Sequence, residues 1–255
     1  MACGSIVSSV RVSETVGITD FFKTYTKHAR GLLKQHDEDR AMSLAVGGDF
    51  EAVGALEFCA LRQNGLEGHH RVVDVGCGSG RLAYQLKDFL SGTFVGLDVV
   101  PELYEYAERI CGRPDWNFYA APGLEIPEAD QSADFICFFS VFTHLLHEES
   151  YRYLQDAFRV LKPDGRVVFS YLDFAVPEHW YIFEATVKDR RPDKHLNQFI
   201  SQDAIRAWAG HLGFKILQLD PQGNVLLDRR IVCDDGRVME GPAALGQSIC
   251  VLTKL

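Results

Sequence analysis

Hydrophobic and polar residues alternate with two different periods along the middle of the chain. Short apolar runs rich in β-branched and aromatic residues predict strands, and segments with apolar residues every three or four positions predict helices. The predicted strands cover residues 71–75, 93–97, 116–120, 135–139 and 166–172. The predicted helices between them cover residues 81–90, 102–111 and 148–161. Because strands and helices take turns, the pattern predicts parallel strands joined by crossover helices.

The pattern before this alternating region is helical. Residues 18–40 carry apolar side chains at helical spacing between lysines and arginines, which predicts one amphipathic helix. A break at Gly47-Gly48-Asp49 separates it from a second predicted helix at 51–63. We therefore divide the chain into an N-terminal helical lid and substrate-pocket segment, residues 1–66, and a core, residues 67–255.

Beyond residue 173 the alternation is less regular, and two insertions are predicted. One is a second lid segment at 173–200, within which residues 177–190 have a helical pattern. The other is a hairpin insertion at 222–246 that turns at Asp234-Asp235-Gly236. The remaining predicted elements are a helix capped by Ser201 and ended by Gly213, and strands at 214–219 and 248–253.

The overall composition excludes several classes of protein. Hydrophobic residues make up 47% and charged residues 24% of the 255 positions, which is typical of a globular domain and excludes disorder, collagen and coiled coil. The net charge is −9 and no segment is basic, so the chain lacks the clustered positive charge with which proteins bind nucleic acid or an anionic membrane. No apolar stretch approaches the ~20 residues that span a bilayer. We expect neither a nucleic-acid nor a membrane partner, and the sequence leaves the oligomeric state open.

The cysteines indicate a reducing compartment. There are seven of them, an odd number, and they are scattered with no C-x-x-C pair, so neither a disulfide framework nor a zinc site is predicted. The first ten residues lack the basic and apolar regions of a signal peptide. We therefore expect a cytoplasmic protein.

The most informative stretch is a glycine-rich turn between the first predicted strand of the core and the helix that follows. Glycines at positions 76, 78 and 80 would let a ligand approach the backbone where a Cβ atom would clash. Asp98 stands eighteen residues after Gly80, at the end of the second strand, where a carboxylate can accept hydrogen bonds from a ribose diol. Asp98 is equally placed to cap the helix that begins at Pro101.

Two details of this turn argue against a dinucleotide. A dinucleotide turn has glycine at its sixth position, and here that position is Arg81, which we expect to be a solvated helix residue. Asp74 lies inside the strand, two residues before Gly76. Its carboxylate would repel a pyrophosphate and attract an ammonium group.

The pattern Asp74-x-Gly76-x-Gly78-x-Gly80 with Asp98 resembles the first two motifs of the class I S-adenosylmethionine-dependent methyltransferases. The resemblance spans residues 71–172, because residues 132–145 are similar to that family's fourth strand and loop, and 161–166 to its turn before strand five. It implies an α/β fold with a doubly wound, mixed seven-stranded sheet whose last strand is antiparallel. Residues 45–50 are similar to an element that precedes the core in a small-molecule branch of the family.

The resemblance also implies a cofactor, S-adenosylmethionine, with S-adenosylhomocysteine as the product. It would place the methionine end at Asp74, Gly76 and Gly78, the ribose at Asp98 and the adenine at Val99. The loop after the third strand departs from the family pattern, since no acid stands where the adenine amino group is often bound; backbone at Gly123 or Leu124, or Glu125, would take that role. The full set of implied cofactor residues is Asp74, Gly76, Cys77, Gly78, Gly80, Asp98, Val99, Gly123, Leu124, Phe139 and Ser140.

Methyl transfer needs a base only where the acceptor must lose a proton. His144 is the candidate, because it follows the fourth strand at the edge of the sheet where ligands bind in open α/β folds; packing against the next helix is the alternative. Core packing is the alternative for Tyr25 and Trp180, and a turn cap for Asp173. No acid ends the fourth strand, so we expect no metal. The predicted substrate residues are Tyr25, Phe50, His144, Asp173, His179 and Trp180.

These observations predict transfer of a methyl group to O or N of a small-molecule acceptor. Residues 140–143 lack the Asn/Asp-Pro-Pro-aromatic run of enzymes that methylate nucleic-acid amino groups. Two other functions stay open: a non-catalytic S-adenosylmethionine-binding protein, and an aminopropyltransferase that uses a decarboxylated cofactor.

Overall fold

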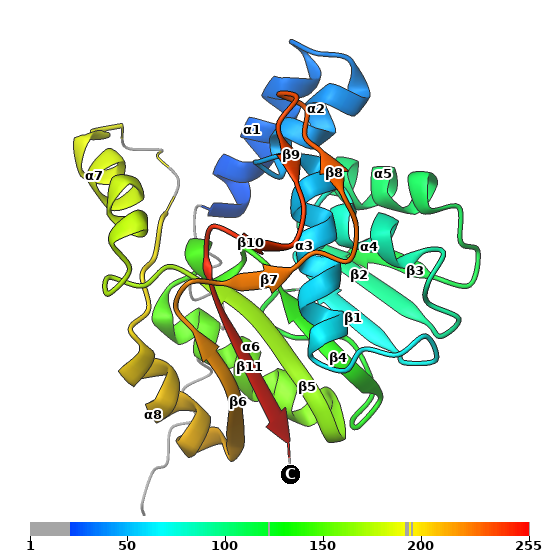
Figure 1. Cartoon of the computed structure of the whole chain (residues 1–255), viewed down its shortest axis with the longest axis vertical. Coiled ribbons are helices and arrows are strands. Elements are labelled where there is room, and N and C mark those ends of the chain that lie inside the picture. The colour runs from blue at the N-terminus through cyan, green and yellow to red at the C-terminus, as the bar shows by residue number, and fades with distance from the viewer. Residues whose placement is uncertain (1–20, 122, 192–193, 195, 255) are drawn as a thin grey trace, which may run out of the picture.

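The computed structural model describes residues 21–121, 123–191, 194 and 196–254. A seven-stranded sheet with the order β3-β2-β1-β4-β5-β11-β6 crosses the molecule (Figure 1). Strands β1 to β5 pair in parallel, and β11 is antiparallel to both of its neighbours, so the predicted mixed sheet is confirmed. The strands are β1 (Val72–Val75), β2 (Phe94–Asp98), β3 (Asn117–Ala120), β4 (Ala133–Phe138), β5 (Leu161–Tyr171), β6 (Phe214–Asp220) and β11 (Ser248–Lys254).

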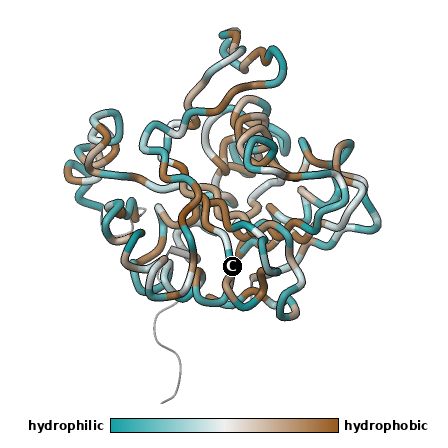
Figure 2. The backbone as a smooth tube through the Cα atoms, turned by 60° about the horizontal axis from the view of Figure 1, so that its bottom comes forward, coloured by the Kyte–Doolittle hydropathy of each residue, from teal (hydrophilic) through white to brown (hydrophobic). Residues whose placement is uncertain are grey.

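Helices cover both faces of this sheet. Successive residues of a strand point to opposite faces, so neighbouring residues of β1 belong to two different buried clusters. Val72 belongs to a buried cluster with α3 (Phe50–Gln63), α4 (Arg81–Leu86) and α5 (Pro101–Cys111). Val73 belongs to a second cluster with α6 (His147–Val160) and α8 (Gln202–Leu212). Ser201 caps α8 as predicted, accepting a hydrogen bond from Ala204 N. Figure 2 shows hydrophobic residues concentrated at the centre of the molecule and hydrophilic residues toward its periphery.

The N-terminal region contains two helices where one was predicted. α1 (Phe21–Leu33) ends early, and α2 (Glu38–Ala45) starts anew at Asp37, whose side chain accepts from Arg40 N. The single helix at 18–40 is therefore wrong, and its first three residues lie outside the described part. α1 and α2 pack on α5 through a third buried cluster that contains Ala29, Met42 and Leu103.

The segment after β5 stands apart from the sheet. A 3-10 turn, η2 (Pro177–His179), leads into α7 (Trp180–Lys188), and Figure 1 shows this helix projecting from the body. No side chain of α7 is buried, and Trp180 is 43% exposed, so core packing of Trp180 is ruled out. No helix within the described ranges is long and apolar enough to cross a bilayer.

The insertion before the last strand contains two antiparallel pairs of short strands, and the second pair lies between the two strands of the first pair in the sequence. β7 (Asn224–Leu226) pairs with β10 (Pro242–Ala244), and β8 (Ile231–Val232) pairs with β9 (Val238–Met239). The Gln63 side chain on α3 donates to Leu226 O at 2.6 Å and accepts from Leu226 N at 3.2 Å. The insertion is thereby held against α3.

Candidate active site

A cavity of about 390 Å³ opens beside the carboxyl ends of β1, β2 and β4. The strand order reverses between β1 and β4, and ligands of open α/β sheets bind at such a reversal. The volume is within the range of small-molecule sites. Among the predicted cofactor residues, the cavity is lined by Asp74, Gly76, Cys77, Gly78, Asp98, Val99, Phe139 and Ser140.

The glycine turn lies against side chains from two other segments. Gly76 and Gly78 have φ angles of 78° and 54°, in the left-handed region that favours glycine. A Cβ atom on Gly76 would lie 2.4 Å from Val141 Cγ2, and one on Gly78 would lie 2.5 Å from Val46 Cγ1. Gly80 does not line the cavity; a Cβ there would lie 2.6 Å from Ala107 Cβ, so its role is packing of the turn on α5.

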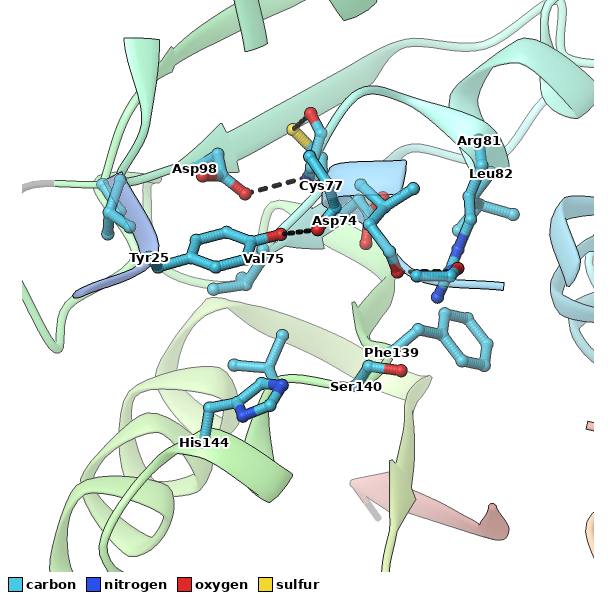
Figure 3. A pocket seen from close by; sticks show the side chains of 18 of the residues that line it. Tyr25, Asp74, Val75, Cys77, Arg81, Leu82, Asp98, Phe139, Ser140 and His144 are labelled. Carbon is cyan, nitrogen blue, oxygen red and sulfur yellow. Dashed lines mark hydrogen bonds between the residues drawn. The ribbon is translucent and has the colours of Figure 1, made fainter. Parts of the chain in front are cut away.

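Asp98 ends β2 with a buried carboxylate at the cavity wall. Its Oδ2 accepts from Gly78 N at 2.9 Å (Figure 3), and its Oδ1 accepts from Val100 N at 2.9 Å. Burial raises the pKa of Asp98 to about 6, against the lowering effect of these backbone hydrogen bonds. Asp98 therefore caps the backbone before α5 and faces the cavity at the same time.

A buried group of charges forms another part of the wall. Asp74 is 3% exposed, and burial, followed by the nearby Glu57 carboxylate, raises its pKa well above the ordinary range. Arg81 is 8% exposed, so the expectation of a solvated residue is wrong. Its Nη2 lies 2.6 Å from Glu57 Oε1, and its Nη1 donates to the carbonyls of Val46 and Gly47 at 3.0 Å. Sequence reasoning missed Glu57, because helical periodicity on α3 carries no sign of a partner on α4.

The side of the cavity opposite Arg81 brings together residues from α1, from the 3-10 turn η1 (Phe142–His144) after β4, and from the loop after α7. Tyr25 donates its hydroxyl to Ala45 O at 3.0 Å, and burial raises the pKa of Tyr25. His144 faces the cavity from the β4 side (Figure 3), and its Nδ1 lies 2.8 Å from Leu196 O. A carbonyl can only accept, so Nδ1 carries the proton and the lone pair of a neutral imidazole is on Nε2.

Asn197 also lines this side and was not predicted. It donates from Nδ2 to Thr186 Oγ1 at 2.8 Å, which joins the cavity wall to α7. Its sequence context, between Leu196 and Gln198 in an irregular loop, gives no signal of such a position.

Four of the predicted substrate residues lie outside the cavity lining. Phe50 packs the edge of its ring on Tyr84, with centroids 6.1 Å apart. Asp173 and His179 are both buried and contact each other, with Asp173 N donating to His179 Nδ1 at 3.0 Å. Trp180 donates its indole N–H to Phe174 O at 2.9 Å. These contacts stabilise local turns, and Asp173 Oδ1 accepts from Ala175 N at 3.0 Å, which is the turn cap given as the alternative for Asp173.

The loop after β3 contributes Ala121 to the lining rather than Gly123 or Leu124. The Gly123 carbonyl accepts from the Tyr153 hydroxyl at 2.6 Å, and Tyr153 itself lines the cavity. Tyr153, on α6, therefore takes part of the wall that the sequence suggested for Gly123.

A separate group with metal-ligand spacing occurs among the described residues at Glu67, His69 and His70. It precedes β1, at the opposite end of that strand from the glycine turn. Glu67 N donates to His70 Nδ1 at 3.0 Å, so one imidazole nitrogen already has a backbone partner. The group is remote from the cavity and takes no part in its chemistry.

Known proteins similar to this chain share its central region. A methyltransferase-domain family model matches residues 73–169, from β1 to β5. A ubiquinone/menaquinone biosynthesis C-methyltransferase of Citrifermentans bemidjiense is 28% identical over 61% of this chain and 75% of its own length. A malonyl-[acyl-carrier protein] O-methyltransferase of Hahella chejuensis is 26% identical over 56% of this chain and 50% of its own length.

Solved structures show the same fold at lower identity. Magnesium protoporphyrin IX methyltransferase from Synechocystis, with bound S-adenosylhomocysteine, superposes with a TM-score of 0.60 at 14% identity, covering 90% of this chain and 98% of that one. A possible histamine N-methyltransferase from Thermotoga maritima gives a TM-score of 0.59 at 16% identity, covering 92% and 100%. The fold of this chain is thus the fold of these solved structures.

Proposed function

Since the chain contains a class I S-adenosylmethionine-dependent methyltransferase domain, we propose that it transfers the methyl group of S-adenosylmethionine to a small-molecule acceptor. The observation that carries the proposal is the convergence of Asp74, the glycine turn and Asp98 on one cavity. The backbone of the glycine turn therefore lies beside the buried carboxylates of Asp74 and Asp98 on the wall of one cavity.

The described residues fit this cofactor in three respects. Gly76 and Gly78 line the cavity without side chains, so a ligand can lie directly against their backbone. Asp98 is a buried carboxylate whose ionised form is disfavoured by burial, and hydroxyl donors such as those of a ribose would stabilise it. Asp74 would attract the ammonium group of the methionine end. The cofactor supplies, when bound, a methyl group already activated by its sulfonium.

The contribution of the protein is then mainly orientation, which can supply roughly 7–11 kcal/mol of a reaction barrier. We assign the proton-accepting role to His144, whose Nδ1–H is held by Leu196 O and whose Nε2 carries the lone pair. A base at this place serves an oxygen or nitrogen acceptor that loses a proton during attack. Tyr25 and Asn197 would contact the acceptor from the other segments of the wall.

The cavity supports a small acceptor rather than a polymer. Its volume of about 390 Å³ must hold the reactive parts of both substrates, and the side nearest His144 is apolar, with Val141 and Leu145. The relatives' names include a C-methyltransferase and an O-methyltransferase, so the acceptor atom varies among them. We propose that this chain methylates oxygen or nitrogen, without nucleic acid as the acceptor.

We further propose that the protein acts in the cytoplasm, where thiols stay reduced. The described cysteines are all free and buried, namely Cys59, Cys77, Cys111, Cys137, Cys233 and Cys250. Cys3 lies outside the described residues.

Binding and turnover test the proposal together. Calorimetry with S-adenosylmethionine, S-adenosylhomocysteine and NAD should show binding of the first two only. Incubation with a metabolite extract and methyl-labelled cofactor should then give a labelled product by mass spectrometry. Binding without any labelled product would favour a non-catalytic protein. Turnover of the decarboxylated cofactor would favour an aminopropyltransferase. Binding of NAD alone would overturn the assignment.

A further inference from the structure

Ser140 adopts a backbone conformation that is rare for a residue with a side chain. It follows β4, lines the cavity and has a φ angle of 59°. Residues other than glycine, asparagine and aspartate seldom occupy this left-handed region, and they persist there only when surrounding contacts enforce it. The contacts that enforce it here can be identified.

Three residues form a closed ring of hydrogen bonds around this conformation. Ser140 N donates to Ser170 Oγ at 2.7 Å, the Ser170 hydroxyl donates to Gln247 Oε1 at 2.7 Å, and Gln247 Nε2 donates to Ser140 Oγ at 3.0 Å. Each donor is matched by one acceptor, and hydrogen bonds in such a ring polarise one another. The ring joins the end of β4 to β5 and to the residue before β11.

Gln247 is itself held firmly. Its carbonyl packs so tightly on Gly223 that a Cβ atom there would lie 1.9 Å from it. On its other side, Ser248 begins β11 and donates its hydroxyl to Pro221 O at 2.8 Å. Both ends of the hairpin insertion therefore fix the point from which the Gln247 side chain reaches Ser140.

The ring determines where the preceding carbonyl points. In a trans peptide the N–H and C=O bonds point in opposite directions, and the described residues contain no cis peptide. The Ser140 N–H points toward β5, so the Phe139 carbonyl points toward β1, on the other side of β4. Asp74 lies one residue before the end of β1, and the glycine turn follows that strand, so this carbonyl is directed to the end of the cavity that holds Asp74.

We propose that Gln247 and Ser170 are positioning residues that hold the Phe139–Ser140 peptide so that its carbonyl accepts from the ammonium group of the cofactor's amino-acid end. This inference rests on the proposed function. It gives the residue that directly follows the hairpin insertion a part in cofactor recognition, although neither Gln247 nor the insertion lines the cavity. Neither Gln247 nor Ser170 contacts the cofactor in this arrangement.

The test compares ligands that differ only in the amino-acid end. Affinities of wild type, Gln247→Ala and Ser170→Ala are measured by calorimetry for S-adenosylhomocysteine and for 5′-methylthioadenosine, which lacks the amino-acid end. Loss of one or two hydrogen bonds that set the peptide should weaken S-adenosylhomocysteine binding by about tenfold. Methylthioadenosine binding should change by less than about twofold, because adenine and ribose contacts remain.

Gln222→Ala is the matched control, since Gln222 begins the insertion that Gln247 follows and has an exposed side chain. It should leave both affinities unchanged. Equal weakening of both ligands in Gln247→Ala would indicate general damage to the site and overturn the inference, as would wild-type affinity for both. A wild-type protein that binds neither nucleoside would instead overturn the proposed function.

Discussion

Arg81 and Glu57 form a buried ion pair in the wall of the cavity, with Arg81 Nη2 2.6 Å from Glu57 Oε1. Arg81 Nε also donates to the same oxygen at 2.8 Å, and Nη1 donates to Val46 O and Gly47 O. One guanidinium thus joins α3 and α4 to the loop between α2 and α3. That loop contains Val46, which packs on Gly78, so the ion pair supports the glycine turn indirectly.

Glu57→Ala should destabilise the protein strongly, because it leaves the Arg81 charge buried without its carboxylate. Removal of one partner of a buried pair costs about 3–5 kcal/mol, and urea unfolding followed by circular dichroism measures the loss. The control is Glu51→Ala on the same helix, whose exposed carboxylate accepts from Gln85 Nε2. A loss below about 1 kcal/mol in Glu57→Ala, similar to a surface change, would show that water replaces the carboxylate.

Asp98→Ala should weaken cofactor binding by about tenfold to several hundredfold, since two charge-assisted hydrogen bonds to a ribose would be lost and partly replaced by water. Calorimetry with S-adenosylhomocysteine measures this. The same variant leaves Gly78 N and Val100 N without their carboxylate acceptor, so a modest fall in the melting temperature of the free protein accompanies it. Unchanged affinity with a lowered melting temperature would mean that Asp98 is a backbone cap alone.

Cofactor affinity should fall as the pH is lowered below about 6. The pKa of folded Asp98 is raised from 3.8 to about 6, so the folded protein holds this proton more tightly than the unfolded chain. The contribution of Asp98 to stability is therefore greatest below pH 3.8 and is lost as the pH rises through about 6. Ribose hydroxyls favour the ionised form, so binding strengthens over that same rise.

Asp74 acts in the same direction, because burial raises its pKa as well and an ammonium group favours its ionised form. Affinities measured from pH 5 to pH 8 should show the dependence, and Asp98→Asn should remove its part near pH 6. An affinity that stays constant across this range in the wild type would contradict the ionisation argument.

The sequence predicted those parts of the site that depend on local pattern. Each parallel strand was predicted from an apolar run. The glycine turn follows one such strand and Asp98 stands at the end of the next. Because parallel strands end at the same edge of a sheet, the topology brings the turn and Asp98 together. The break between α1 and α2 was missed because Asp37 is a cap within a continuous amphipathic pattern.

Residues whose role depends on a distant partner could not be predicted. Arg81 looked solvated because its partner Glu57 lies on another helix, and Gln247 gave no signal because Ser140 and Ser170 lie far away in sequence. His179 was predicted to be a substrate residue, whereas its ring bonds to the backbone of Asp173. A single sequence contains the residues of such pairs but not the pairing.

His144→Ala should lower turnover by about 10² to 10⁴ while cofactor affinity stays unchanged, because a general base acts in the transition state and not in the binding of the methyl donor. Its Nδ1–H is fixed by Leu196 O, so the ring presents Nε2 as its proton acceptor. Only the neutral imidazole can act as a base, so turnover in the wild type should rise as the pH increases and the ring loses its second proton.

His144→Gln separates basicity from orientation, because glutamine can hydrogen-bond an acceptor but cannot remove its proton. This variant should lose most of the turnover and the rise with pH. His147→Gln is the matched control, since His147 binds Phe199 O through Nε2 and does not line the cavity. If His144→Gln keeps nearly full turnover at every pH, His144 orients the acceptor. If His144→Ala does so as well, alignment of the two substrates is sufficient for the reaction and no base is needed.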